Sequence, residues 1–462
     1  MDEKSRPNIL FIIIDATRAD HFSAYGYPRL TTPNMDRIAS EGVLYENAIS
    51  PAGWTLPATT SIFTGTYVAK HGVNNENHVL GNKLITMPEV LKRAGYHTIG
   101  FCTNDWISEA TGLARGFNEY YRFNYSRFIH KAKRFLNSVR NGGKDSWAFA
   151  INQRIKRWLR QNKAEKPFFM FVHYGELHLP YQLPRPYNTR FLPEGMSYQE
   201  AMRVNQDPKA FYAGVAKMNQ RDFEISKALY DCALTYVDDR VQEIYAELKR
   251  VGQLDQTIII ITSDHGESLG EHGHFDHYYV LYDCLLKVPL IIRYPQLFPA
   301  GTRIKKMVQT LDILPTLKEI LGLFDPELNE MQGLALPPLD KNGEVREFTI
   351  AERYKDLKGL KKSYPDRDLA HLKQWELDRK IAIRTEKYKL IDSTDYEPEL
   401  FDLENDPAEQ HNIFYEQKPI AEELRQKITS WRGTFTAATS AGQEANFDDA
   451  MRKRLESLGY LG

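Results

Sequence analysis

Three residues that could hold a divalent cation follow apolar runs of the chain. Asp15 comes directly after Ile9–Ile14, and Asp264 and His265 come shortly after Thr257–Thr262. Polar residues at the carboxyl ends of parallel strands converge on one edge of a sheet, so these three are predicted to meet there. Two carboxylates and an imidazole suit a divalent metal. Taken singly, each has the simpler interpretation of a helix cap or a partner of loop amides.

Thr55 lies in a segment that could present a nucleophile or bind an oxyanion. The segment reads Gly-Trp-Thr-Leu-Pro-Ala-Thr-Thr-Ser over residues 53–61, and Pro57 suits the first turn of a helix. Thr55 would then lie just before that turn, facing unpaired backbone N–H groups and the positive end of the helix dipole. This environment favours phosphate, sulfate or an alkoxide. The alternative interpretation is an ordinary N-cap.

The elements expected to position these residues alternate between buried strands and helices. Helical stretches are predicted over Met87–Ala94 and Asp222–Val251. Buried strands are predicted at four runs rich in β-branched and aromatic residues, namely Ile9–Ile14, Phe168–Val172, Thr257–Thr262 and Pro289–Arg293. Such alternation predicts an α/β fold with a large, mixed but mostly parallel sheet sandwiched by helices.

The composition of the chain changes at two places. Residues 122–165 are rich in Lys and Arg and predict a helical insertion, which is either a solvated surface element or a lid that attracts an anionic substrate. We predict a catalytic domain over residues 1–340 and a small α+β subdomain over residues 341–462. The subdomain is expected to hold strands at Phe348–Glu352, Lys380–Arg384 and Tyr388–Ile391, and a helix at Ile420–Trp431.

The composition argues against several classes of protein. The 462 residues carry a formal net charge of −1, so nothing indicates nucleic-acid recognition. Cys102, Cys232 and Cys284 are far apart, which argues against a disulfide framework or a structural zinc site. The run Ile9–Ile14 is much shorter than the roughly 20 residues that span a bilayer, and no longer apolar run follows. If Met1 is the native start, we expect a cytoplasmic protein; a homo-oligomer is left open.

Several motifs together resemble the sulfatases of the alkaline phosphatase superfamily. Asp15–Asp20 resembles the first metal-ligand motif of that family, and Thr32–Gly42 resembles the segment that follows it. Ser263–Glu267, with Gly270–Gly273, resembles the second metal-ligand motif. The resemblance continues in the same order through Tyr282-Asp283, Val288–Ile292, Asp312–Thr316, Glu399–Leu403 and Asp406-Pro407. It implies an alkaline phosphatase-like fold and a metal-dependent hydrolase.

The sequence departs from the sulfatases at the position of the nucleophile. Sulfatases carry Cys or Ser in a Cys-x-Pro-x-Arg motif and oxidise it to formylglycine, whereas the matching residues here are Thr55, Pro57 and Thr59. The second carboxylate of the family's Asp-Asp pair is Ala16, and His277 stands where sulfatases often have a catalytic Lys. These departures resemble the phosphodiesterase and phosphoethanolamine-transferase branches of the superfamily, where a Thr oxygen attacks phosphorus. The chain also resembles the phosphonate monoesterase branch.

The resemblance implies roles for individual residues. Asp15, Asp264 and His265 would hold the metal together with the Thr55 hydroxyl, which would attack and form a phospho-enzyme. Arg18 would orient a metal-ligand carboxylate or form a structural ion pair. His178 would touch the transferred group or the leaving oxygen, and His277 would protonate the leaving group or bind a second metal. Asn104 would donate to a non-bridging oxygen.

The identity of the metal and the reaction remain open at this point. The donor set favours Mn²⁺ or Zn²⁺ and could accept Ca²⁺ or Mg²⁺. A second metal is open, because His173, His272 and His274 crowd the same region. Asp238 and Asp239 could contribute to it, but their favoured interpretation is as exposed or capping carboxylates. The favoured function is hydrolysis of a phosphodiester or phosphonate monoester. The alternatives are hydrolysis of a sulfuric ester, transfer of a phospho-substituent to an acceptor, and non-catalytic binding; the partner would be a small-molecule or glycan ester.

Overall fold

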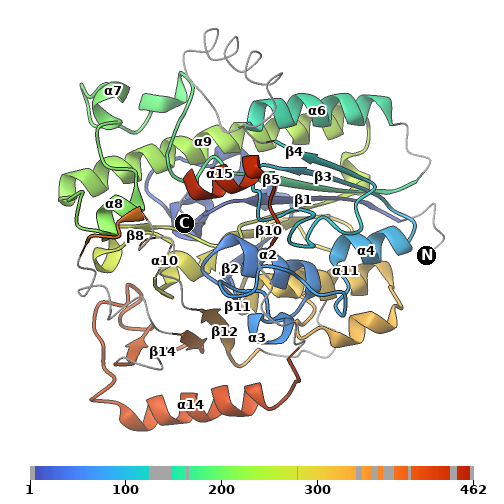
Figure 1. The fold of residues 1–462 in the computed structure, drawn as a ribbon. Helices are drawn as coiled ribbons and strands as arrows, with labels where there is room; N and C mark the ends of the chain where they lie inside the picture. Colours follow the sequence, from blue (N-terminus) through green and yellow to red (C-terminus); the bar gives the residue numbers. More distant parts are fainter. Residues whose placement is uncertain are drawn as a thin grey trace.

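A nine-stranded mixed sheet runs through the larger part of the molecule (Figure 1). Eight strands follow one another in the order β11 (Thr302–Gln309), β2 (Val43–Ile49), β10 (Leu290–Arg293), β6 (Thr257–Thr262), β1 (Asn8–Ile14), β5 (Phe168–Tyr174), β3 (His97–Cys102) and β4 (Glu119–Arg122). The short β9 (Lys287–Val288) pairs with β2. The structure is a computed structural model and describes residues 6–123, 147–162, 166–277, 279–339, 346–354, 360, 363–367, 379–393, 397–437 and 445–457.

The central strands confirm the predicted α/β class. β1 pairs in parallel with both β5 and β6, so the ends of the three runs lie side by side at one edge of the sheet. The fourth predicted strand differs: β10 runs antiparallel to both β6 and β2. The sheet is therefore mixed, and it has an alkaline phosphatase-like architecture with a small antiparallel sheet at the C-terminal end.

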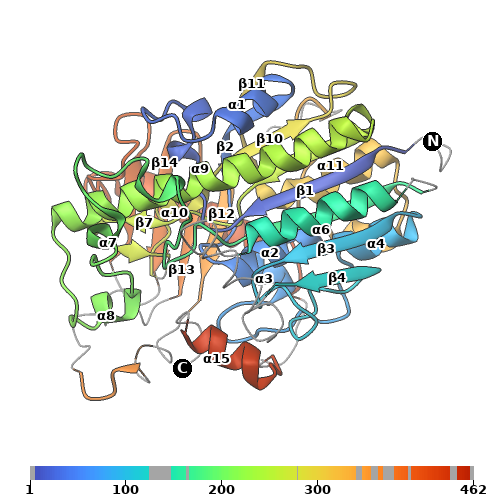
Figure 2. The same cartoon turned by 90° about the horizontal axis from the view of Figure 1, so that it is seen from above.

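Helices cover both faces of the sheet (Figure 2). Alternate side chains of β1 enter two cores, with Ile9, Phe11 and Ile13 in one and Leu10, Ile12 and Ile14 in the other. The first core is completed by α2 (Thr55–Thr64), α4 (Met87–Arg93) and α11 (Ile313–Leu321), and the second by α1 (Pro33–Ser40), α6 (Ala148–Gln161) and the long α9 (Gln220–Arg250). Burial on both faces explains why β1 is a continuous apolar run.

Short elements connect these layers. The short α-helices are α3 (Val68–His71), α7 (Tyr198–Ala201), α8 (Pro208–Tyr212) and α10 (Asp283–Leu286), and β7 (Ser268–Leu269) forms a hairpin with β8 (Phe275–Asp276). The 3-10 turns are η2 (Ala19–His21), η3 (Ser23–Tyr25), η4 (Tyr187–Thr189), η5 (Leu254–Gln256), η6 (Glu271–Gly273), η7 (Thr310–Asp312) and η8 (Pro326–Glu330). Among the described helices, none is long and apolar enough to cross a membrane.

The C-terminal part contains the predicted small sheet. An antiparallel sheet runs in the order β12 (Thr349–Arg353), β13 (Lys380–Arg384), β14 (Tyr388–Ser393) and β15 (Glu399–Asp402), and α14 (Lys418–Arg432) contacts it. The last helix, α15 (Asp449–Ser457), leaves this subdomain: Phe447, Met451 and Leu455 are buried in the core shared with α2 and α4. This last described helix therefore packs on the larger part of the molecule, away from the small antiparallel sheet.

The described part of the 122–165 insertion packs on the body of the molecule. The apolar face of α6 buries Ile151, Ile155 and Leu159 in the core shared with α9. Its polar face pairs with α9 through Lys156–Glu243 and Arg160–Glu247, at 2.6 and 2.9 Å. α6 is thus a structural layer. The rest of the predicted insertion, at 124–146 and 163–165, lies outside the described residues.

Asp238 and Asp239 bind the first turn of α1, which agrees with the favoured interpretation as capping carboxylates and not with the alternative of a second metal site. Asp238 lies on α9, is fully buried, and accepts the backbone N–H groups of Asn34 and Met35 at 3.0 and 2.8 Å. Asp239 accepts the side-chain amide of Asn34 at 2.9 Å. Asp238 therefore caps the first turn of a neighbouring helix, where a carboxylate satisfies backbone donors that the helix itself leaves unpaired.

Replacing Asp238 by Ala is expected to lower the free energy of unfolding by about 1–2 kcal/mol, because buried N–H groups at the start of α1 lose their acceptor. Chemical denaturation measures this change. Asp239→Ala is the matched control and should cost less, since it leaves both backbone bonds in place. Metal content should be unchanged in both variants; loss of metal from Asp238→Ala would contradict the capping role.

Candidate active site

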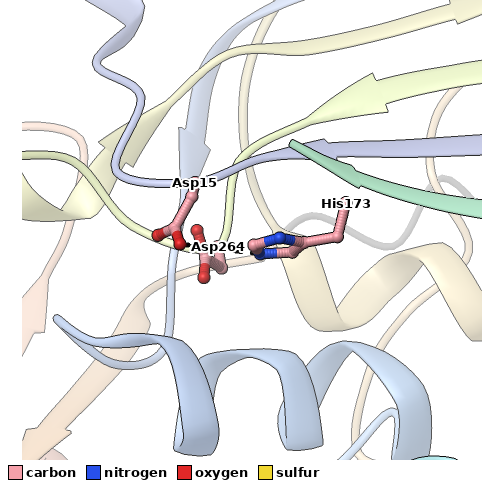
Figure 3. Close-up of side chains that lie close together, drawn as sticks. All are labelled: Asp15, His173 and Asp264. Carbon is pink, nitrogen blue, oxygen red and sulfur yellow. Dashed lines mark ion pairs between the residues drawn. The ribbon is translucent and has the colours of Figure 1, made fainter. Parts of the chain in front are cut away.

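Three unpaired polar atoms converge at the carboxyl edge of the central strands. Asp15 follows β1, His173 lies near the end of β5, and Asp264 follows β6 (Figure 3). One ligand atom from each lies within 4.8 Å of the others, and all three residues are at most 1% exposed. Among the described residues, Asp15 Oδ1, Asp264 Oδ2 and His173 Nε2 have no hydrogen-bond partner. Leaving such atoms unpaired is costly, so this donor set fits a divalent cation.

His265 and Thr55 complete this cluster from two further segments. His265 Nε2 lies 3.5 Å from Asp15 Oδ1 and 3.7 Å from Asp264 Oδ2. Its Nδ1 lies 2.8 Å from the carbonyl of Gly266, which places the proton on Nδ1 and leaves the lone pair of a neutral ring on Nε2. Burial lowers the pKa of His265, which keeps the ring neutral as a metal ligand requires.

The Thr55 hydroxyl lies at the start of α2, surrounded by polar groups of the cluster. Thr55 is the first residue of the helix rather than its cap, a shift of one position from the prediction. Its Oγ1 lies 3.3 Å from His265 Nε2 and accepts from Asn104 Nδ2 at 3.3 Å. Asn104 also donates to Asp15 Oδ2 at 3.1 Å, so it links the hydroxyl to the carboxylate.

A strained turn carries Asp15 into the site. Ala16 has φ 54°, a left-handed conformation that costs energy for a residue with a Cβ. The turn is held from α9, since the hydroxyl of Tyr230 donates to the Ala16 carbonyl at 2.8 Å and accepts the Arg18 N–H at 2.9 Å. Ser263 Oγ accepts the N–H of Thr17 at 2.8 Å. These bonds join the segments that carry the two carboxylates.

Gly266 is required by a close contact between backbone segments. A Cβ at this position would lie 2.1 Å from the carbonyl oxygen of Cys284. The N–H groups of Gly266 and Glu267 donate to Leu285 and Cys284, at 2.7 and 3.0 Å. Gly266 lets the segment after the Asp264-His265 pair lie close against α10.

A second buried cluster surrounds His277. Its Nδ1 lies 2.5 Å from Asp276 Oδ1 and 3.3 Å from Glu267 Oε1, and all three residues are at most 2% exposed. The ring lies against the first cluster, with centroids 4.4 Å from His265 and 5.2 Å from His178. Although burial opposes a charged ring, Asp276 and Glu267 raise the pKa of His277 well above its ordinary value. Burial and Asp276 raise the pKa of Glu267.

Asp15 illustrates the electrostatic balance of the site. Burial alone would raise the pKa of this carboxyl, but the imidazoles of His173, His178, His265 and His277 hold it below its ordinary value. Two members of the site, Asn104 and His178, are only partly buried, whereas Thr55 is fully buried. The cluster therefore meets solvent on the side of Asn104 and His178.

Comparison with known proteins identifies the family of this chain. The sulfatase family model covers residues 7–323, and a second model, described as N-sulphoglucosamine sulphohydrolase, C-terminal, covers residues 270–434. The chain belongs to the sulfatase family. It is accordingly an ester hydrolase of the sulfatase and alkaline phosphatase superfamily, whose members bind a divalent metal.

Individual relatives carry different names. An N-acetylglucosamine-6-O-sulfatase of Bacteroides thetaiotaomicron is 26% identical, covering 89% of this chain and 83% of its own. The solved structure of a phosphonate monoester hydrolase of Agrobacterium radiobacter has a TM-score of 0.74 at 23% identity and covers 96% of this chain and 100% of its own. A second such hydrolase, from Silicibacter pomeroyi, has a TM-score of 0.75 at 20% identity, with 94% and 96% covered. The two structures share the fold.

Within this sulfatase-family site, one predicted residue lies apart. The Arg18 guanidinium binds Asp20 through two bonds, at 2.9 and 2.8 Å, and lies 3.0 Å from Glu271. The expected bond from Arg18 to a metal-ligand carboxylate is therefore wrong, and the alternative of a structural ion pair holds. The other predicted residues do come together: Asp15, Thr55, Asn104, His178, Asp264, His265 and His277.

Three contributors were given no definite role from the sequence. His173, which ends an apolar run in the same way as Asp15, was predicted only to lie near the metal region, and the same strand-end rule would have placed it beside Asp15. Glu267 belongs to the Asp-His-Gly-Glu motif, and Asp276 precedes His277, but neither spacing indicates which side chains face the same imidazole. His272 and His274 contact Tyr282 and Tyr212 instead of the unpaired atoms.

Replacing Tyr230 by Phe should lower the free energy of unfolding by about 1–3 kcal/mol, because the buried Ala16 carbonyl and Arg18 N–H lose their partner. Metal affinity should fall as well, since the turn that carries Asp15 loosens. Tyr181→Phe is a matched control: Tyr181 is equally buried, contacts the Tyr230 ring, and its hydroxyl has no hydrogen-bond partner within the described chain. Equal effects of the two variants would contradict this role of Tyr230.

Proposed function

We propose that this protein is a metal-dependent hydrolase of phosphate esters, either phosphodiesters or phosphonate monoesters, that works through a Thr55 phospho-enzyme. The observation that carries the proposal is the position of the Thr55 hydroxyl. It stands at the N-terminus of α2, 3.3 Å from both His265 Nε2 and Asn104 Nδ2, beside the unpaired oxygens of Asp15 and Asp264. A hydroxyl in such a place is a suitable nucleophile and lies where anionic groups are stabilised.

The side chain of Thr55 favours phosphorus over sulfur chemistry. Formylglycine is an aldehyde, and it forms from a side chain whose Cβ carries two hydrogens. The Cβ of threonine carries a methyl group, so the aldehyde cannot form from it. An ester of the Thr55 oxygen must therefore be opened by water, which is an accessible route for a phosphoryl ester.

The proposed roles follow from this geometry. Asp15, Asp264, His265 and Thr55 would hold the metal, which lowers the pKa of a coordinated hydroxyl and neutralises charge on the transferred group. Thr55 Oγ loses its proton to solvent and attacks phosphorus, and the bond from phosphorus to the leaving oxygen breaks. Asn104 Nδ2 donates to a non-bridging oxygen. Water then attacks phosphorus, releasing the phosphorus-containing product and restoring the hydroxyl.

His277 is proposed to protonate the leaving oxygen. With its Nδ1 proton directed to Asp276 and Glu267, the ring can deliver a proton from Nε2. His178 lies beside it on the partly exposed side of the cluster, where the ester would enter. The ester itself could be a small molecule or a glycan, and a cytoplasmic location remains part of the proposal.

Hydrolysis of a sulfuric ester is the second candidate, since the family match and several relatives carry the name sulfatase. Transfer to an acceptor alcohol would share the first half of the mechanism. It would differ only in the second half, where the alcohol and not water attacks the phosphorus of the phospho-enzyme. Product partitioning in the presence of added alcohols separates transfer from hydrolysis.

The proposal is tested with metal-stripped protein refilled with Mn²⁺, Zn²⁺, Ca²⁺ or Mg²⁺ and assayed on bis(p-nitrophenyl) phosphate, p-nitrophenyl phosphate and p-nitrophenyl sulfate. We expect metal-dependent cleavage with the diester preferred. Thr55→Ala should lower kcat/KM on the order of 10³-fold or more. Thr55→Ser, which keeps the hydroxyl, should retain much of the activity.

Two results would overturn parts of this assignment. Preference for p-nitrophenyl sulfate would replace the reaction while leaving the site intact. Full activity in Thr55→Ala would mean that another group attacks. Trapping a labelled phospho-enzyme in the wild type, absent from Thr55→Ala, identifies the covalent step directly.

The role of His277 can be tested through the leaving group. Asp276→Asn weakens the bond that orients the ring, so kcat/KM should fall about 10–100-fold for aryl diesters with poor leaving groups and only a few-fold for p-nitrophenyl esters. Rates across a series of substituted phenols measure this dependence. His277→Asn should show the same pattern, and combining both changes should add little. A loss independent of the leaving group would show that Asp276 serves only stability.

A further inference from the structure

His173 is a buried imidazole with an unusual environment. It is 0% exposed at the end of β5, paired in register with Ile13 of β1. Its Nε2 has no hydrogen-bond partner among the described residues. The closest acidic atom, Asp15 Oδ2, lies 3.8 Å away, which is too long for a hydrogen bond. The fold thus buries a nitrogen that nothing in the described protein satisfies.

The contacts of Thr103 favour the tautomer of His173 that carries its proton on Nδ1. Thr103 Oγ1 donates to the His173 carbonyl at 3.3 Å and lies 3.3 Å from His173 Nδ1. Because that hydroxyl proton points to the carbonyl, the oxygen is left to accept Nδ1–H. The lone pair of the neutral ring is then on Nε2 and is directed toward the two carboxylates (Figure 3). This is how a metal-ligating imidazole is commonly held by a neighbour.

The separations agree with donors around one cation. Two donors bound at about 2.1 Å to the same ion lie roughly 3.0–4.2 Å apart, depending on the angle between them. His173 to Asp15, His265 to Asp15 and His265 to Asp264 measure 3.8, 3.5 and 3.7 Å. Asp15 uses Oδ2 toward His173 and Oδ1 toward His265. The next residue, Ala16, offers no side-chain donor.

We propose that His173 is a direct ligand of the divalent cation, alongside Asp15, Asp264 and His265. Two carboxylates and two neutral imidazoles balance the charge of one divalent ion. Two nitrogen donors favour Zn²⁺ or Mn²⁺ and disfavour Ca²⁺ and Mg²⁺, which prefer oxygen. The inference concerns only the metal centre and does not depend on which ester is cleaved.

The test counts imidazoles on the metal without substrate. Metal-stripped protein is loaded with one equivalent of Mn²⁺, and pulsed electron paramagnetic resonance measures the coupling to coordinated nitrogen. We expect two imidazole nitrogens in the wild type and one in His173→Asn. Zn²⁺ affinity, measured by competition with a chelating dye, should fall at least about tenfold in this variant, while Ca²⁺ affinity changes less because the amide supplies an oxygen.

The control is His21→Asn, which removes another buried imidazole, one that pairs with Asp231. It should keep both nitrogen couplings and the Zn²⁺ affinity of the wild type. One nitrogen in the wild type, or unchanged Zn²⁺ affinity in a folded His173→Asn, overturns the proposal. The wild-type spectrum decides the question even if the variant fails to fold. If the assays show no catalysis through Thr55, the number of imidazole nitrogens on the metal is unaffected. Each of the two proposals can therefore be refuted without refuting the other.

Discussion

The arrangement of the site depends on burying two carboxylates side by side. Asp15 and Asp264 follow adjacent parallel strands and are almost completely removed from water, each with one unpaired oxygen. Two like charges in a poorly solvated place are strongly unfavourable unless positive charge is supplied. The imidazoles of His173 and His265 and the N-terminus of α2 surround the pair, but they leave specific atoms unsatisfied. A divalent cation would supply the positive charge and bind the unpaired atoms.

The surrounding structure keeps these atoms in place. The β1 and β6 segments are joined by Ser263, and the strained Ala16 turn is bonded to Tyr230 of α9. On the opposite face, Trp54 precedes the nucleophile candidate and packs edge-on against Trp106, with ring centroids 5.4 Å apart. Trp106 in turn contacts Phe447 from the C-terminal segment, at 5.2 Å. Phe447 thus supports the segment that carries Thr55, although the two lie nearly 400 residues apart in the sequence.

The two acidic clusters are chemically different. In the first, the carboxylate and imidazole atoms stand 3.5–3.8 Å apart and face a common centre. In the second, His277 contacts Asp276 directly at 2.5 Å, so these groups satisfy one another. A cation between Asp276 and His277 would have to break that contact. The geometry therefore distinguishes a cluster whose atoms could hold a cation from a cluster in which an imidazole is paired with a carboxylate. The two clusters adjoin where the tilted rings of His265 and His277 lie with their centroids 4.4 Å apart.

The sequence alone determined the α/β class and predicted where three polar residues meet, because buried parallel strands are continuous apolar runs and deliver polar residues at one edge. That rule placed Asp15, Asp264 and His265 together. It did not anticipate β2, β3 or β11, whose apolar and polar residues are mixed, nor the antiparallel direction of β10. The roles of Thr55, Asn104, His178 and His277 were implied by the family resemblance instead. Only the tertiary structure decided that Arg18 pairs with Asp20, that Asp238 caps α1, and that His173 faces the carboxylates. Those outcomes depend on contacts between side chains of segments that are far apart in the sequence. The spacing of residues along the chain does not specify such contacts.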